Sequence, residues 1–459
     1  MKFTSFLLFK TINIEAAILI DCKMDKIKKY SGEWWDEFLD RTDHLKKTCV
    51  FKDCMTRDET RAFRANVLEI VQTLAFLRTD KYGYRVYVDG KLLDRDGMSQ
   101  IYDSPPLPGE DIYKWTERVF KDKKFGMIIN LGEKFNLELS QQIAIKTKPY
   151  LEKTGFPVDG INFSIFIGNY DKTPLGIHKD PPGQDVMHFH LGPGEKHMYT
   201  WGKDQFEDLI NNKGYDKKDV EGLLPFSTRF SFNEGDMYFM PEGEYHIGKQ
   251  DGLSMAITFW RYNHTKGTLV RKLQNVIFSQ YLKTNEDLLK PDKNPLTVND
   301  WIDTTLDTIE IPAGLENKSY KELMREAYSD LRYSIHSNAG YRTSPFLKDG
   351  DMQFDLDDFI EIEKPFNILY KTSFDNQKLH VYVRGQKVEF NNFECIRLFI
   401  QEINKGIPIK VRDVIRYLDA EWNENIGIYI LNLLYKNHGI KKLLNRKDKT
   451  AEYQVAENG

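Results

Sequence analysis

Cysteine is scarce in this sequence. The chain of 459 residues has four, and of these only Cys49 and Cys54 lie close together along the chain. A zinc site built on cysteine needs a second matched pair, which neither Cys22 nor Cys395 completes. We therefore expect reduced thiols in a cytoplasmic protein.

Long apolar runs are also missing. The first residues, MKFTSFLLFKTINIEAAILIDCKMDK, hold two apolar stretches, which Lys10 and Glu15 interrupt. Neither stretch approaches the roughly 20 uninterrupted apolar residues of a membrane span, and no small-residue cleavage site follows them. We predict no membrane partner, and Met24 offers an alternative natural start for the chain.

An excess of one charge is the third missing feature. Lysine and arginine number 65 and aspartate and glutamate 69, which gives a net charge of -4 at pH 7. From Gln401 to the end there are ten basic and eight acidic residues, a balance that offers little to a phosphate backbone. We therefore predict a peptide-docking or packing role for this last part of the chain rather than nucleic-acid binding.

The length and the 41% of apolar residues indicate more than one domain. Residues 1–124 mix helical patterns such as ETRAFRANVLEIVQTLAFLR with the hairpin signal Asp89-Gly90, and form an N-terminal α/β segment. Residues 125–264 change to short alternating stretches such as INFSIFIGNY, VMHFHLG and LSMAITFWRY, separated by Gly and Pro turns. This part predicts an antiparallel β-barrel or sandwich.

The second half of the chain has a different sequence pattern. Residues 265–350 are predicted to be helical, and residues 351–459 combine a strand pair, LHVYVRGQKVEF, with short helical runs. A hairpin beside small helices indicates a winged-helix-like domain. The fold class is therefore α+β.

Histidine is concentrated in the β-rich part. Five of the ten histidines, His178, His188, His190, His197 and His246, fall within 69 residues. In GIHKDPP, His178 and Asp180 lie two residues apart, and His246 follows the turn of MPEGEYHIG. Two histidines and one carboxylate form the facial triad of non-haem iron(II) oxygenases, which leaves coordination positions open for a co-substrate and O2.

The stretch TPLGIHKDPPGQDVMHFHLGPGEKHMYTW, followed by GDMYFMPEGEYHIG, resembles the JmjC/cupin-type 2-oxoglutarate oxygenases. That resemblance implies a double-stranded β-helix barrel and hydroxylation of a protein or peptide side chain, with 2-oxoglutarate converted to succinate and CO2. Demethylation begins with the same C–H oxidation and stays open. The domain order is similar to that of the ribosomal-oxygenase subgroup, which implies a homodimer formed through the helical segment.

The resemblance also implies roles for individual residues. His178, Asp180 and His246 would bind Fe(II), and Lys196 would hold the distal carboxylate of 2-oxoglutarate, with Arg261 as the alternative. Asn162, Ser164, Thr173 and His190 are further candidates for hydrogen bonds to the co-substrate, and Asp251 is a candidate neighbour of the site. The longer insertion HFHLGPG before Lys196 leaves the choice of the co-substrate residue open.

Two alternatives remain at this point. A cupin metalloenzyme with a reaction that does not use 2-oxoglutarate would share the fold, and His188 or His190 could then be additional ligands. A non-enzymatic cupin-like sensor with a winged-helix output domain is the other. Turnover of 2-oxoglutarate to succinate distinguishes them.

Overall fold

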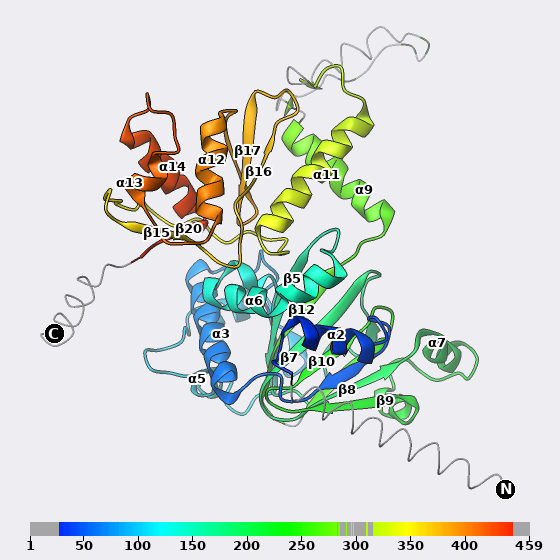
Figure 1. Ribbon diagram of the computed structural model, residues 1–459. Helices are drawn as coiled ribbons and strands as arrows, with labels where there is room; N and C mark the ends of the chain where they lie inside the picture. Colours follow the sequence, from blue (N-terminus) through cyan, green and yellow to red (C-terminus); the bar gives the residue numbers. More distant parts are fainter. Residues whose placement is uncertain are drawn as a thin grey trace, which may run out of the picture. The chain divides into compact units, whose positions relative to one another are not determined.

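The computed structural model describes residues 27–250, 252–281, 283, 284, 291, 295, 297, 309, 310 and 315–443, so that Met24 and Asp251 lie outside it. The chain forms two compact units, Met1–Asn263 and His264–Gly459. Each unit combines helices with antiparallel strands (Figure 1), which confirms the predicted α+β class. The finer division into four domains stays a prediction.

The first unit is built on an eight-stranded and a four-stranded sheet. The larger sheet has the order β1-β10-β7-β12-β5-β4-β2-β3, and the smaller has the order β6-β11-β8-β9. The strands are β1 (Cys49–Phe51), β2 (Arg85–Val88), β3 (Lys91–Leu92), β4 (Phe125–Ile129), β5 (Ile161–Gly168), β6 (His178–Lys179), β7 (Gln184–Pro193), β8 (Lys196–Trp201), β9 (Thr228–Phe232), β10 (Met237–Met240), β11 (Tyr245–Gln250) and β12 (Ser254–Tyr262).

The chain switches between the two sheets as it runs from β5 to β12. Strands β5, β7, β10 and β12 form the centre of the larger sheet, while β6, β8, β9 and β11 make the smaller one. Every pairing among these strands is antiparallel. The first 124 residues add β1, β2 and β3 to the larger sheet, so this segment is structurally part of that sheet.

The alternation of side chains along β7 shows why the strands have two functional faces. Phe189 packs outward, with its ring 6.3 Å from that of Tyr30, whereas His188 and His190 share the opposite face with their rings 6.1 Å apart. Phe239 of β10 likewise contacts Phe38 at 5.4 Å. The outer face is therefore an aromatic core, and the inner face carries the polar groups.

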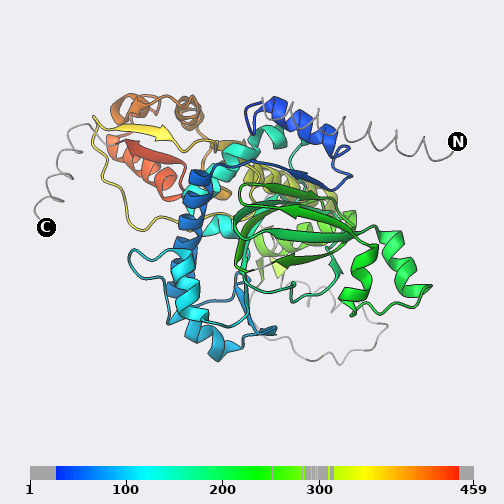
Figure 2. The ribbon, with the colours of Figure 1, turned by 90° about the horizontal axis from the view of Figure 1, so that it is seen from below.

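Helices α2, α3 and α6 lie beside the larger sheet, whereas α7 and α8 pack against the smaller one (Figures 1 and 2). Helix α3 begins with a capping box in which Thr56 and Glu59 satisfy each other's backbone N–H groups, a strong start signal. The helices of this unit are α2 (Gly32–Arg41), α3 (Arg57–Leu77), α4 (Arg95–Tyr102), α5 (Ile112–Phe120), η1 (Gly132–Lys134), α6 (Leu137–Thr154), α7 (Lys203–Asn211), α8 (Val220–Leu223) and η2 (Leu224–Phe226).

The second unit has a helical part and a mixed part. Helices α9 and α11 share an apolar core of Leu273, Ile277, Leu323 and Ala327. The predicted strand pair is present as the hairpin of β17 and β18, beside β16. The elements are α9 (Lys266–Val276), η3 (Ile277–Tyr281), β13 (Lys283–Thr284), β14 (Ile309–Glu310), α11 (Tyr320–Ser337), β15 (Phe359–Ile362), β16 (Leu369–Thr372), β17 (Lys378–Val383), β18 (Gln386–Asn391), α12 (Glu394–Asn404), β19 (Ile409–Lys410), α13 (Val411–Ile415), α14 (Glu424–Lys436) and β20 (Ile440–Leu443).

The mixed part packs α12, α13 and α14 with the sheet β19-β15-β20 around a core that includes Ile360, Phe399 and Leu431. Its description as a winged helix stays a prediction, as does the homodimer. None of the helices in the described residues is long and apolar enough to cross a membrane.

Candidate metal centre and its cavity

The three predicted metal ligands come from two neighbouring strands of the smaller sheet. His178 begins β6, Asp180 follows it, and His246 is the second residue of β11. Strands β6 and β11 are antiparallel, and His246 lies directly opposite His178 in the register. Because directly paired residues face the same side of a sheet, the pairing brings together residues 68 positions apart in the sequence.

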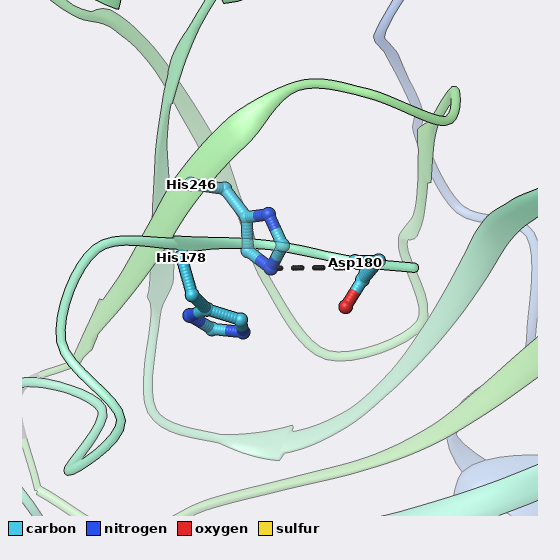
Figure 3. A group of neighbouring side chains, drawn as sticks. All are labelled: His178, Asp180 and His246. Atoms are coloured by element: carbon cyan, nitrogen blue, oxygen red, sulfur yellow. Dashed lines mark ion pairs between the residues drawn. The ribbon is translucent and has the colours of Figure 1, made fainter. Parts of the chain in front are cut away.

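The side chains converge on one point (Figure 3). One potential ligand atom from each of His178, Asp180 and His246 lies within 4.8 Å of the other two. The imidazole rings of the two histidines are 4.3 Å apart between centroids, and Nε2 of His246 is 4.0 Å from Oδ2 of Asp180. The structure thus assembles two histidines and one carboxylate, the donor set of a facial triad.

Backbone carbonyl groups orient both histidines. Nδ1 of His178 donates to the carbonyl oxygen of Gly176 at 2.9 Å, and Nδ1 of His246 donates to that of Glu244 at 3.2 Å. A carbonyl oxygen only accepts, so the proton of each neutral ring is on Nδ1. The lone pair of each Nε2 is then available to a metal ion, the arrangement that metal-binding histidines typically show.

The electrostatics of the cluster favour a bound cation. Burial raises the pKa of Asp180 to about 6, against the opposing effect of His178, and its Oδ2 atom is buried without a hydrogen-bond partner among the described residues. Burial and, to a smaller extent, the nearby His178 lower the pKa of His246 to about 3. An orphaned carboxylate oxygen beside a neutral imidazole is costly unless a cation completes the site.

A second cluster of potential ligands, Glu326, Asp330 and His380, lies in the other unit. There the ammonium group of Lys371 bonds to Glu326 and lies 2.6 Å from Asp330. The hydroxyl of Tyr382 also donates to Asp330, at 2.5 Å. A protein cation therefore already occupies the position that a metal ion would need, and this cluster is an ion-pair network.

A cavity of about 260 Å³ adjoins the triad, whose three side chains form part of its wall. Lys196 also lines it and is 5% exposed. Its ammonium group donates to Gln250 Oε1 at 2.6 Å and to the hydroxyl of Tyr170 at 3.2 Å, both of which are neutral. A buried ammonium with only neutral partners is suited to pairing with an anion that enters the cavity.

Glycine at position 248 makes room at this end of the cavity. A Cβ atom there would lie 3.0 Å from Oγ1 of Thr173 and 3.2 Å from Cε of Lys196. Thr173, which also lines the cavity, donates its hydroxyl to the Gly248 carbonyl at 3.1 Å. The backbone of β11 thus lies close to both Thr173 and Lys196, the candidate residues for binding the co-substrate.

Further polar groups of the wall are unsatisfied. Four atoms are buried without a hydrogen-bond partner among the described residues: Arg85 Nε, His188 Nε2, Tyr238 Oη and Trp260 Nε1. Burial lowers the pKa of His188 well below its usual value, so the ring is neutral, and its Nδ1 shares a hydrogen bond with Thr258. Such a wall offers donors to an oxygen-rich ligand.

Four other predicted residues lie elsewhere, outside the set of described residues that line this cavity. Asn162 accepts from the Tyr262 hydroxyl, and Ser164 donates to Asn130. His190 bonds through Nε2 to the Gly194 carbonyl at 2.7 Å. Arg261 donates to the hydroxyl of Tyr150 at 2.8 Å and to Asp185 at 3.2 Å.

The structure also adds residues that the sequence did not single out. Arg85 of β2, Asn130 after β4 and Tyr170 after β5 line the cavity. Arg85 and Asn130 reach it because β2 and β4 extend the larger sheet beyond β5. No local motif marks these residues, since their place depends on long-range strand pairing.

Comparisons with protein-family models and with curated proteins gave no match. Among solved structures, the chain aligns with ribosomal oxygenases. One is YcfD from Escherichia coli, with 14% identity, 89% of this chain and 97% of YcfD covered, and a TM-score of 0.46.

A structure of YcfD in complex with cobalt and 2-oxoglutarate aligns with a TM-score of 0.43, at 14% identity over 89% of this chain and 98% of that one. The non-haem alpha ketoglutarate dependent carbocyclase SnoK, from nogalamycin biosynthesis, aligns at 13% identity over 59% of this chain and 96% of its own, with a TM-score of 0.31. At this level of similarity the chemistry has to be inferred from the site itself.

Proposed function

We propose that this protein is an Fe(II)- and 2-oxoglutarate-dependent oxygenase that hydroxylates a side chain of a protein or peptide. The observation that carries the proposal is the His178–Asp180–His246 cluster, with its unpartnered carboxylate oxygen, in the wall of a cavity that also holds the buried ammonium of Lys196. The strand order of β5 to β12 supports a double-stranded β-helix as the scaffold.

The donor set fits iron(II). Nε2 of His178, Nε2 of His246 and a carboxylate oxygen of Asp180 would hold the ion from one side and leave its other positions open. When bound, iron(II) supplies the redox chemistry that couples oxidative decarboxylation of 2-oxoglutarate by O2 to hydroxylation of a C–H bond. No further protein ligand is needed, and His188 is then available as a hydrogen-bonding residue of the wall.

Other residues of the chain bind the co-substrate and exclude water. Lys196 neutralises the far carboxylate of 2-oxoglutarate, and Tyr170, whose hydroxyl oxygen accepts from Lys196, donates its O–H to the same end, while Thr173 lines the wall there. The apolar side chains of Ile128 and Phe166 exclude water from the same cavity. This exclusion strengthens the pairing between the ammonium and the carboxylate, because the local dielectric constant is low.

The decisive experiment is turnover by the purified full chain. Incubation with Fe(II), ascorbate and 2-oxoglutarate should produce succinate, and the Asp180→Ala variant should not. A protein that binds a metal ion but forms no succinate, with or without candidate peptides, would instead be a cupin with another reaction or a cupin-like sensor. Detection of succinate by mass spectrometry separates these outcomes.

A further inference from the structure

A larger hollow of about 750 Å³ opens beside the metal cavity, and we call it the basic groove. The two share Tyr170, Thr173, Leu175 and His178 in their walls. His178 therefore faces both spaces. A substrate that lies in the basic groove is next to the proposed iron ligand, which is where a reacting C–H bond has to be presented.

The charge of the basic groove is opposite in sign to that of the chain. Its wall includes Lys124, Lys172, Lys217 and Lys218 but one acidic residue, Asp171. Lys124 pairs with Asp171 at 2.9 Å. The other three lysines are exposed and form no ion pair within the part of the chain that the structure describes. Three lysines without an ion pair thus line this hollow, in a protein whose net charge is -4, although Asp216 and Asp219 flank Lys217 and Lys218 outside its wall.

The remaining wall is apolar and aromatic. Tyr87 of β2 and Phe125 of β4 lie on one side, and Leu175 on the loop before β6 is 48% exposed. Lys217 and Lys218 belong to the segment before α8. Because the edge of the larger sheet and two loops contribute, the basic groove is a built surface with apolar walls and a charged rim, the usual anatomy of a recognition site.

We propose that the basic groove binds an acidic stretch of the polypeptide substrate and so selects the residue that is hydroxylated. This inference rests on the proposed function and names its substrate class. Carboxylates on the peptide pair with Lys172, Lys217 and Lys218, while neighbouring side chains contact Tyr87 and Leu175. A nucleic acid is the poorer fit, because affinity for the phosphate backbone grows with the number of phosphates that Lys and Arg neutralise and this groove offers three lysines without an ion pair.

Direct binding tests the inference without turnover. Fluorescein-labelled octapeptides of alternating Glu and Ala, Gln and Ala, or Lys and Ala would be titrated with the full chain, and the anisotropy measured. At low salt the Glu peptide should bind at least about tenfold more tightly than the Gln peptide, and the advantage should shrink as NaCl is added. Equal affinity for the Glu and Gln peptides would overturn the inference.

A matched pair of variants locates the binding. The triple variant Lys172→Glu, Lys217→Glu, Lys218→Glu should weaken binding of the Glu peptide by about tenfold or more, because attraction becomes repulsion. The control Lys46→Glu, Lys47→Glu, Lys81→Glu changes the net charge equally at exposed lysines outside the basic groove and should keep the wild-type affinity. Equal losses of affinity for the Glu peptide in the two variants would show that the effect comes from net charge alone. They would disprove a binding site in the basic groove.

Two further outcomes separate this inference from the proposed function. A labelled ten-nucleotide RNA that binds through the three lysines while the Glu peptide does not would make the groove a nucleic-acid surface and overturn the inference. Normal succinate formation without Glu-peptide binding leaves the oxygenase standing and removes the substrate class. Glu-peptide binding without any succinate formation leaves the basic groove as a binding surface for acidic peptides but removes the oxygenase, and with it the role of the groove in selecting a hydroxylated residue.

Discussion

The Nε2 atom of His246 lies 4.0 Å from Oδ2 of Asp180, too far for a hydrogen bond and close enough for one cation to contact both. Two metal–ligand bonds of about 2.0–2.2 Å at right angles hold their donor atoms about 3 Å apart, so the two side chains need to approach each other by about 1 Å to bind one ion. His178, opposite His246 in the strand register, supplies the third donor. The two atoms therefore form no hydrogen bond with each other, and both are available to a bound ion.

The first prediction concerns these ligands. His178→Ala, Asp180→Ala and His246→Ala should each abolish iron-dependent succinate formation and weaken Fe(II) binding, measured by anaerobic calorimetry. Circular dichroism should remain close to wild type, since Asp180 Oδ2 has no hydrogen-bond partner among the described residues and each histidine substitution removes a single hydrogen bond to a main-chain carbonyl. His197→Ala is the control, because His197 is also buried but bonds to Ser231 outside the triad. Full activity and iron affinity in His246→Ala would disprove the triad.

The second prediction concerns the co-substrate. Lys196→Ala should raise the KM for 2-oxoglutarate by roughly ten- to a hundredfold, about 1.4–2.8 kcal/mol of lost binding, with iron affinity near wild type. Steady-state kinetics at varied 2-oxoglutarate measure the effect. Lys249→Ala, which removes a lysine of β11 that pairs with Glu221 of α8, should leave the KM unchanged. If Arg261→Ala has the large effect and Lys196→Ala does not, the carboxylate is held from β12.

The third prediction is a pH dependence in the second unit. Burial disfavours the ionised form of Asp330, but hydrogen bonds from Lys371 and Tyr382 and the charge of Lys387 outweigh it and lower its pKa to about 2. A depressed carboxyl pKa stabilises the fold above the unfolded-state value of 3.8, and this contribution is lost as the pH falls toward 2.

Asp330→Asn should therefore reduce the free energy of unfolding by about 2 kcal/mol at pH 7, and the difference from wild type should shrink between pH 4 and pH 2. Urea unfolding of the full chain at several pH values provides the measurement. Asp351→Asn is the control, since Asp351 pairs with Lys436 but is 68% exposed. A difference that stays constant down to pH 2 would show that the charge of Asp330 is not what stabilises this unit.

The fourth prediction concerns assembly through residues 265–350. Val270 and Phe278, from α9 and η3, are 41% and 58% exposed in the single chain, and an apolar face of this kind can be covered by a second copy. Light scattering at micromolar concentration should give the mass of a dimer, and Phe278→Asp should shift it toward the monomer. A wild-type monomer under these conditions would remove the predicted dimer.

The class of fold and the three triad residues could be predicted from the sequence because both depend on local patterns. Alternation defined the strands, and the spacing of His178 and Asp180, with His246 after a Pro-Gly turn, marked two strand ends. Arg85 and Asn130 escaped prediction because they reach the cavity only through the pairing of β2 with β4 and of β4 with β5. The alternation of side chains correctly predicted that His188 and His190 lie on one face of β7. It could not predict where along the strand the cavity lies, and therefore which of the two histidines lines it.

The hydrogen bonds that orient His178 and His246 end on main-chain oxygens, and this has a consequence for the evolution of the site. Many metal-binding histidines are oriented by a carboxylate side chain, which a single substitution can remove. Exchange of the Glu244 side chain leaves its carbonyl acceptor in place. Fewer single substitutions in this chain can therefore disable the metal centre. A relative that has lost the metal should carry substitutions of the ligands His178, Asp180 or His246 themselves.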